Sequence, residues 1–265
     1  MRFVLVHGAS HGAWCWDLLV PELNQLGHEA VALDLPGHGM RATETATLRG
    51  YRDAVVEQLA GDDVLVGHSM GSAVAALAAD ARPDLVRHIT LLSGPLPVEG
   101  QCLSYQSTSA SVGGSASDDA LESVSEDNVR FTDDGSAFYW DRDGAYATFF
   151  HDCDEKLGDW AAERLVPQAL APVVQPISIP RFWAADLPRS YILTLQDRAW
   201  PPRIGRLQAR RMGVEPLAID SSHSPFFSQP AELARLLVRA VDTTPVGPLT
   251  PGDTMAAADA SRVST

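Results

Sequence analysis

The sequence has little cysteine, no long apolar run and a deficit of positive charge. Three cysteines in 265 residues are too few and too scattered for a disulfide framework or a metal site. No apolar run approaches the roughly 20 residues that a membrane-spanning helix needs. The formal net charge of −14 argues against a nucleic-acid partner or an anionic membrane surface. It favours a neutral substrate over a strongly anionic one, although a merely soluble acidic surface is the simpler cause of the charge.

The amino terminus lacks a visible secretory signal. After Met1 and Arg2 the chain enters an apolar strand, with no separate apolar segment and cleavage site. We therefore expect a cytoplasmic protein. With 45% hydrophobic residues, a chain of this length can bury one sizeable core, as a single α/β domain with an inserted cap does. The oligomeric state does not follow from these features.

Short apolar runs alternate with helical patterns over most of the chain. The runs predict strands at 3–6, 29–33, 63–66, 88–92, 190–195 and 215–219. The helical patterns lie at 12–26, 46–60, 71–82, 201–212 and 229–241. This alternation predicts a doubly wound, mostly parallel sheet with right-handed crossovers.

The alternation breaks between Gly94 and about Leu187. This segment is rich in Ser and Gly at first, then acidic, and later carries many aromatic residues. We interpret it as a helical cap over the substrate pocket. Its aromatic side chains could line that pocket or form the cap's own core, and the second alternative is the commoner fate of large apolar side chains. The tail, 243–265, is predicted to be disordered.

The most informative motif is a serine between two glycines. Ser69 follows the apolar run Val64–Val66 and precedes a helix of small residues, with Gly67 and Gly71 on either side. Such a nucleophile elbow turns so tightly that bulky flanking side chains would clash, which leaves the serine hydroxyl at the apex. A solvent-exposed serine in a Gly-rich turn is the alternative, and the strand-turn-helix context disfavours it.

A nucleophilic serine needs a base and an acid that orients the base. Asp197 follows the strand predicted at 190–195, and His223 lies in the loop after the strand predicted at 215–219. Both positions are at the carboxyl ends of strands, where a parallel sheet places its active site. Asp186 and Asp220 are rival acids, but Asp186 precedes its strand and Asp220 is suited to shaping the loop. His223 could also be an ordinary loop histidine.

The first strand ends in a His-Gly pair that suits an oxyanion hole. His7 and Gly8 follow it directly, so the N–H of Ala9 could be one donor, with the N–H of Met70 as the other. Two such preset donors are typically worth several kcal/mol of barrier. A plain strand-to-helix turn would also explain Gly8.

With these parts the chain resembles the α/β-hydrolase superfamily, in its branch of methylesterases and hydroxynitrile lyases. The motifs that carry the resemblance are residues 7–16, 26–28, 32–39, the Ser69 elbow, Asp197, His223 and, more weakly, 149–153. The resemblance implies a cap inserted after the sixth strand of the superfamily. It implies a triad of Ser69, Asp197 and His223, oxyanion donors at Ala9 and Met70, and no metal or organic cofactor. The implied domains are a core of 1–97 and 187–242 and a cap of 98–186.

Departures from that pattern favour ester hydrolysis. The lyases of this branch carry a Lys after the catalytic His and a Thr at the position of Gly8, whereas this chain has Ser224 after His223. The sequence therefore predicts a serine esterase that cleaves a small, neutral, apolar or aromatic ester. Residues considered for substrate binding are Gly8, Ser10, His11, Trp140 and Phe150. A lactone or activated-amide hydrolase, a hydroxynitrile lyase and a receptor without turnover remain alternatives.

Overall fold

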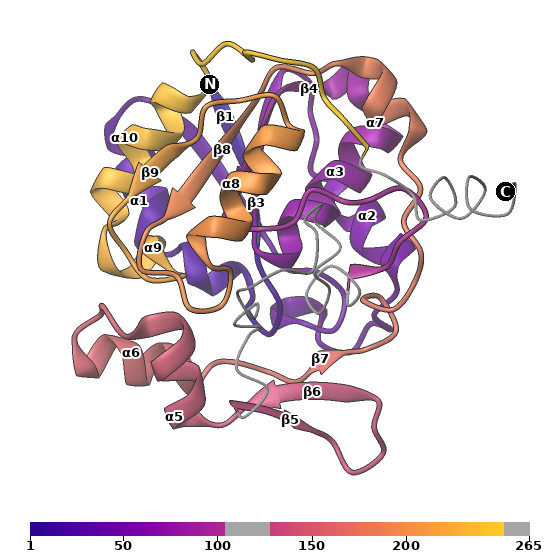
Figure 1. Ribbon diagram of the computed structural model, residues 1–265. Helices are drawn as coiled ribbons and strands as arrows, with labels where there is room; N and C mark the ends of the chain where they lie inside the picture. The colour runs from indigo at the N-terminus through magenta and orange to yellow at the C-terminus, as the bar shows by residue number, and fades with distance from the viewer. Residues whose placement is uncertain (104–127, 252–265) are drawn as a thin grey trace, which may run out of the picture.

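The computed structural model describes residues 1–103 and 128–251, with a parallel sheet at the centre (Figure 1). Six strands lie in the order β2-β1-β3-β4-β8-β9, and every neighbouring pair is parallel. Their bounds are Arg2–Val6 (β1), Glu29–Leu33 (β2), Asp63–His68 (β3), Val86–Leu92 (β4), Arg189–Thr194 (β8) and Leu217–Ile219 (β9). All six strands predicted from the sequence are confirmed.

Helices cover both faces of this sheet, because its central strands are apolar on both sides. All six residues of β3 are buried, which is typical of a parallel strand between two layers. One face carries α2 (Leu48–Val56), α3 (Met70–Ala81), α7 (Pro180–Ala185) and α8 (Pro202–Arg211). The other face carries α1 (Leu19–Gln25), α9 (Pro225–Ser228) and α10 (Pro230–Ala240). A 3-10 turn, η1 (Ala13–Trp16), precedes α1. Further 3-10 turns are η2 (Gly39–Arg41) and η3 (Pro83–Leu85).

Residues 128–169 of the inserted segment lie at the end to which the strands point (Figure 1). It is more mixed than the helical cap that the sequence predicts, because it contains a three-stranded antiparallel sheet in the order β5-β6-β7. Its elements are β5 (Val129–Phe131), β6 (Ala137–Trp140), α5 (Arg142–Ala145), the π-helical turn η5 (Tyr146–Phe150), α6 (Glu155–Ala162) and β7 (Gln168–Ala169). Residues 104–127 of the predicted cap lie outside the described residues.

The end of the predicted cap segment packs on the core. The Asp80 carboxylate on α3 accepts the N–H groups of Arg181 and Phe182, at 2.7 and 2.9 Å, and so holds the start of α7. Phe182 is fully buried in the same apolar cluster as α2 and α3. The predicted cap, which ends at residue 186, therefore includes a helix, α7, that packs with the α/β core.

Two arginines hold the first residues of the predicted disordered tail. Arg189 donates to Gly247 O at 3.0 Å, and Arg211 donates to Pro251 O at 3.0 Å. The backbone of Val246 also donates to Gly213 O at 2.7 Å. Residues 243–251 therefore differ from the prediction of disorder, and 252–265 lie outside the described residues.

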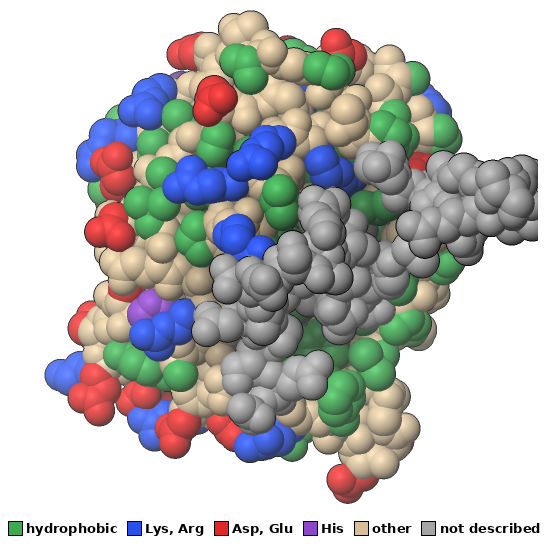
Figure 2. Space-filling view, viewed as in Figure 1, with side chains coloured by type: hydrophobic (Ala, Val, Ile, Leu, Met, Phe, Trp, Pro, Cys, Tyr) green, Lys and Arg blue, Asp and Glu red, His purple; other side chains and the backbone are tan. Residues whose placement is uncertain are grey.

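The surface near α8 differs in charge from the chain as a whole. Figure 2 shows Lys and Arg side chains gathered around α8, whose Arg203, Arg206 and Arg210 are exposed. The formal net charge is nevertheless −14. Among the described residues no helix combines the length and apolar character required to cross a bilayer.

Candidate active site

Ser69 occupies the sharp turn between β3 and α3. Its backbone has φ 50° and ψ −127°, which an L-residue adopts at a cost of about 1–3 kcal/mol. The N–H of Ser69 donates to Leu92 O at 3.0 Å, and its carbonyl accepts from Ser72 N at 2.9 Å. The side chain makes no capping hydrogen bond to α3, so the hydroxyl is not engaged by the helix that it precedes. Backbone strain at a turn of this kind is typical of functional sites.

The two flanking glycines allow this turn because their hydrogens face backbone atoms at close range. A Cβ added at Gly67 would lie 2.4 Å from Gly71 O, and one added at Gly71 would lie 2.5 Å from His7 O. Either contact would force the elbow apart. The steric reason for glycine at both positions, inferred from the motif, is confirmed.

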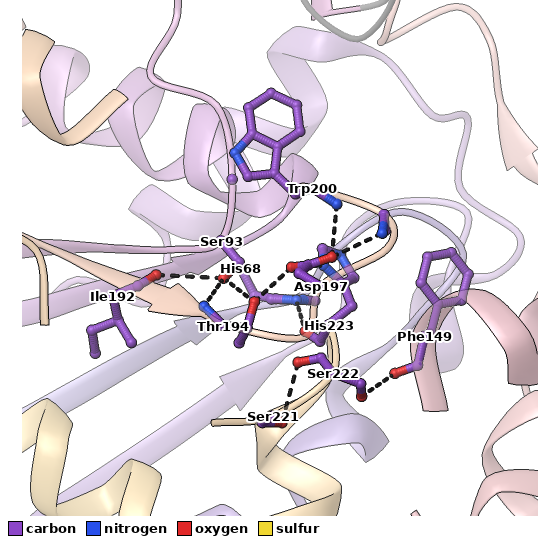
Figure 3. Close-up of polar contacts among 12 residues, drawn as sticks. His68, Ser93, Phe149, Ile192, Thr194, Asp197, Trp200, Ser221, Ser222 and His223 are labelled. Atoms are coloured by element: carbon purple, nitrogen blue, oxygen red, sulfur yellow. Dashed lines mark hydrogen bonds and ion pairs between the residues drawn. The ribbon is translucent and has the colours of Figure 1, made fainter. Parts of the chain in front are cut away.

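His223 and Asp197 meet at the carboxyl ends of β8 and β9 (Figure 3). His223 Nδ1 lies 2.7 Å from Asp197 Oδ2, and both side chains are buried. The His223 ring also lies 4.5 Å from the ring of His68, the neighbour of Ser69. His68 Nε2 donates to His223 O at 2.9 Å, which ties the base loop, residues 220–224, to the elbow.

Among the described residues, four groups donate hydrogen bonds to the Asp197 carboxylate. Oδ1 accepts the N–H groups of Ala199 and Trp200, at 2.8 and 2.7 Å. Oδ2 accepts from the Thr194 hydroxyl at 2.6 Å as well as from His223. Since the single Thr194 proton goes to Asp197, the Ser93 hydroxyl, at 2.6 Å from Thr194 Oγ1, must be the donor in that contact (Figure 3).

The rival acids lie elsewhere. Asp186 is exposed and pairs with Arg189 at 2.7 Å. Asp220 is exposed and accepts from Gln196 Nε2 at 3.0 Å. The structure thus brings Asp197, and neither rival, to His223.

The oxyanion loop, residues 7–11, lies directly against the elbow. A Cβ at Gly8 would be 3.0 Å from Ser69 Cβ. Within residues 1–103 and 128–251, the N–H groups of Ala9 and Met70 have no hydrogen-bond acceptor. Two backbone donors are therefore available on the two segments that adjoin Ser69.

Histidine side chains fix the carbonyls of this loop. The N–H of Leu35 donates to His7 Nε2 at 3.1 Å, so Nδ1 carries the His7 proton and donates to Gly8 O at 2.8 Å. That carbonyl belongs to the same peptide group as the Ala9 N–H. His11 Nδ1 lies 2.7 Å from Ala9 O and donates to it in the same way.

Burial keeps the histidines around the elbow neutral. Desolvation lowers the pKa of His11 to about 4. Desolvation, together with the neighbouring His38, lowers the pKa of His7 well below the ordinary value. Desolvation, together with the neighbouring His223, does the same to the pKa of His68. At neutral pH their rings therefore act as hydrogen-bonding groups without charge.

The residues considered for substrate binding are mostly packed. Ser10, His11 and Phe150 are buried, with Ser10 at φ 63° and the His11 ring stacked 5.6 Å from the Trp14 ring. Trp140 is half-buried and lies 4.8 Å from the Phe149 ring. Their contact with substrate stays a prediction.

Two cap residues that hold the active-site loops escaped the sequence analysis. Gln168 Oε1 accepts the N–H of Ser10 at 3.2 Å, and its amide donates to Tyr51 Oη at 2.9 Å. Asp152 Oδ2 accepts the N–H of Ser222 at 2.9 Å. Asp152 belongs to the weak motif 149–153, which was a usable signal, whereas a lone Gln168 in the cap gives none.

Comparisons with known proteins identify the family of the chain. A family model described as the alpha/beta hydrolase family matches residues 3–236. Methylesterase 7 of Arabidopsis thaliana is 31% identical over 258 residues, covering 91% of this chain and 96% of its own. Norfluorocurarine synthase 1 of Strychnos nux-vomica is 28% identical over 255 residues, covering 91% of this chain and 95% of its own.

A solved structure with the same architecture is a pyrethroid hydrolase from Sphingobium faniae. It has a TM-score of 0.76 and 25% identity, over 92% of this chain and 98% of that one. The family match covers nearly the whole described core, including Ser69, Asp197 and His223. The chain therefore belongs to the alpha/beta hydrolase family.

Proposed function

We propose that this protein is a serine esterase that hydrolyses a small, neutral carboxylic ester. The observation that carries the proposal is the buried Asp197–His223 pair, 2.7 Å apart, beside a strained serine elbow. An acid that fixes the tautomer of a base next to an activated serine is the arrangement that acyl transfer needs. The name of one relative, methylesterase 7, supports the same reaction.

In the mechanism, Ser69 Oγ attacks the ester carbonyl while His223 Nε2 takes its proton. The developing oxyanion accepts hydrogen bonds from the N–H groups of Ala9 and Met70. Asp197 holds the Nδ1 proton of His223 and stabilises the imidazolium, which then protonates the leaving alcohol. A water activated by His223 releases the acid from Ser69.

Ester hydrolysis is supported over cyanohydrin cleavage by two features. Ser224 is fully buried and neutral, so the position after His223 offers no positive charge for a leaving cyanide. Gly8 leaves little space for the Thr of the lyases, because a Cβ there would lie 3.0 Å from Ser69 Cβ and 3.1 Å from His68 Nδ1. Release of cyanide from a cyanohydrin would favour the lyase.

The test is intact-mass spectrometry after exposure to a fluorophosphonate, with wild type compared with Ser69→Ala. Turnover of p-nitrophenyl esters of increasing acyl length is measured in parallel. We expect one label per wild-type chain and ester turnover, with both lost in Ser69→Ala although the fold is kept. Undiminished turnover in Ser69→Ala would refute the assignment, and ligand binding without turnover in wild type would favour a receptor.

Substrate identity and cellular context are separate questions. Lactones and activated amides can react by the same steps, so they belong in the substrate panel. The cytoplasmic location and the absence of nucleic-acid and membrane partners stay predictions from the sequence.

A further inference from the structure

The cap contacts the base loop at the residue that precedes His223. Ser222 donates its N–H to Asp152 Oδ2 at 2.9 Å and its hydroxyl to Phe149 O at 2.8 Å (Figure 3 shows the second contact). Asp152 and Phe149 flank the end of η5, so one short segment of the cap binds both donors of one residue. Asp152 and Ser222 are 70 residues apart in sequence, so only tertiary folding brings them into contact.

The same segment touches the base itself. The Phe149 ring lies 5.5 Å from the His223 ring, and the His68 ring lies 4.5 Å from it. His223 is thus contacted by the cap as well as by the elbow. A shift of the cap segment would therefore move both the backbone before His223 and a ring that packs on it.

Asp152 is suited to hold this loop because its carboxylate is ionised and well satisfied. Partial burial acts to raise the pKa of Asp152, but the polar groups of Ser222, Ser228 and Ser221, with the Ser222 N–H donating at 2.9 Å, outweigh burial and lower it. All three serines lie within five residues of His223. Hydrogen bonds to a charged acceptor are about twice as strong as those between neutral groups.

We propose that Asp152 is a positioning residue for the esterase reaction, which fixes His223 from the cap by way of Ser222. This inference rests on the proposed function. Asp197 sets the tautomer and rotation of the imidazole, whereas Asp152 and Phe149 O set the position of the backbone that carries it. A displacement of about 1 Å in a reacting group can cost about 10²-fold in rate, so the contacts of Asp152 and Phe149 O with Ser222 matter for the chemical step.

The test compares Asp152→Ala with Asp154→Ala in the full-length protein. Asp154 is a matched control, because its side chain caps α6 by accepting from Leu157 N at 3.0 Å and, within the described part of the chain, makes no hydrogen bond to the base loop. We expect Asp152→Ala to lower kcat by roughly 10- to 100-fold with KM nearly unchanged. Asp154→Ala should keep kcat within about twofold. It removes the N-cap of α6, so it should destabilise the cap segment about as much as Asp152→Ala does.

The leaving group separates positioning from general damage. A p-nitrophenol leaves as an anion, whereas an alkyl alcohol needs the proton that His223 delivers. The loss in Asp152→Ala should therefore be larger for ethyl butyrate than for p-nitrophenyl butyrate. Asp152→Asn keeps an oxygen for the Ser222 N–H. Compared with Asp152→Ala, it should therefore recover part of the rate and bring the ratio of the two ester rates back toward the wild-type value.

Four outcomes distinguish the role of Asp152 from the esterase assignment. Equal losses for both esters, or equal losses in Asp152→Ala and Asp154→Ala, would overturn the role of Asp152. If Asp152→Ala does not fold, Ser222→Ala removes the hydroxyl bond to Phe149 O and should shift the same selectivity to a smaller extent, and an unchanged ratio there overturns the proposal. Turnover retained in Ser69→Ala would instead refute the esterase assignment itself.

Discussion

The oxyanion loop and the base loop are both fastened on two sides, but by different chemistry. Neutral groups hold the oxyanion loop, with His7 and His11 on its carbonyls and Gln168 on the N–H of Ser10. Carboxylates hold the base loop, with Asp197 on His223 and Asp152 on Ser222. In the proposed reaction negative charge develops beside the first loop and positive charge on the second. The difference teaches that each loop is held by groups whose charge does not oppose the transition state.

The largest expected effect comes from removing the Asp197 charge that contacts the base loop. Asp197→Asn can donate to His223 Nδ1 and so favour the wrong tautomer, which should lower kcat by roughly 10⁴-fold, as for the corresponding acid in serine proteases. Steady-state kinetics with a p-nitrophenyl ester measures it. Asp220→Asn is the control, since this rival acid is exposed and contacts Gln196. A comparable loss in Asp220→Asn would contradict the assignment of the acid.

Acid should destabilise the protein through the buried His11 of the oxyanion loop. The folded pKa of His11 is about 4 against 6.5 in an unfolded chain, so the unfolded state binds more protons between these values. The free energy of unfolding should therefore fall as the pH falls from 6.5 to 4, by up to about 3 kcal/mol from His11 alone. Urea unfolding at pH 7, 6 and 5 measures this slope. His11→Asn should flatten it, and an unchanged slope would count against the neutral His11 ring.

A pair of buried threonines compares charged with neutral acceptors. Thr194 donates to the Asp197 carboxylate at 2.6 Å, whereas Thr90 Oγ1 lies 3.0 Å from the Ser190 hydroxyl. Thr194→Val should reduce the free energy of unfolding by about 1.5–3 kcal/mol, and Thr90→Val by about 0.5–1.5 kcal/mol. Chemical unfolding of both variants measures the difference. Equal losses would show that the charge of Asp197 adds nothing to its hydroxyl contact.

The smallest effect is expected from the neutral cap contact. Gln168→Leu leaves the Ser10 N–H without its acceptor, so kcat should fall about tenfold, which corresponds to about 1.4 kcal/mol. The loss should be equal for ethyl and p-nitrophenyl butyrate, because the oxyanion forms with both. This result would sharpen the contrast with Asp152, whose removal should discriminate between the two esters. A much larger loss for ethyl butyrate than for p-nitrophenyl butyrate in Gln168→Leu would contradict that contrast.

Local sequence patterns predicted the core better than the cap. Each core strand is a short apolar run with its own turn signals, and the functional residues follow strand ends at predictable places. The cap strands β5, β6 and β7 have only three, four and two residues, too few for a periodic pattern. Residues 243–251 read as a polar, proline-containing tail, yet Arg189 and Arg211 hold them from distant elements.

The sequence by itself determined the six-stranded core, the glycine-flanked elbow and the order of serine, acid and base. These features follow from local periodicity and from the steric demands of one turn, which neighbouring residues encode. The tertiary structure shows that Asp197, which the sequence favoured over Asp220, contacts His223, and it alone shows that Gln168 and Asp152 reach the two active-site loops. The contacts of Asp152 and Gln168 join residues 70 and 158 positions apart, and no local pattern specifies which polar groups will meet once the apolar core has folded.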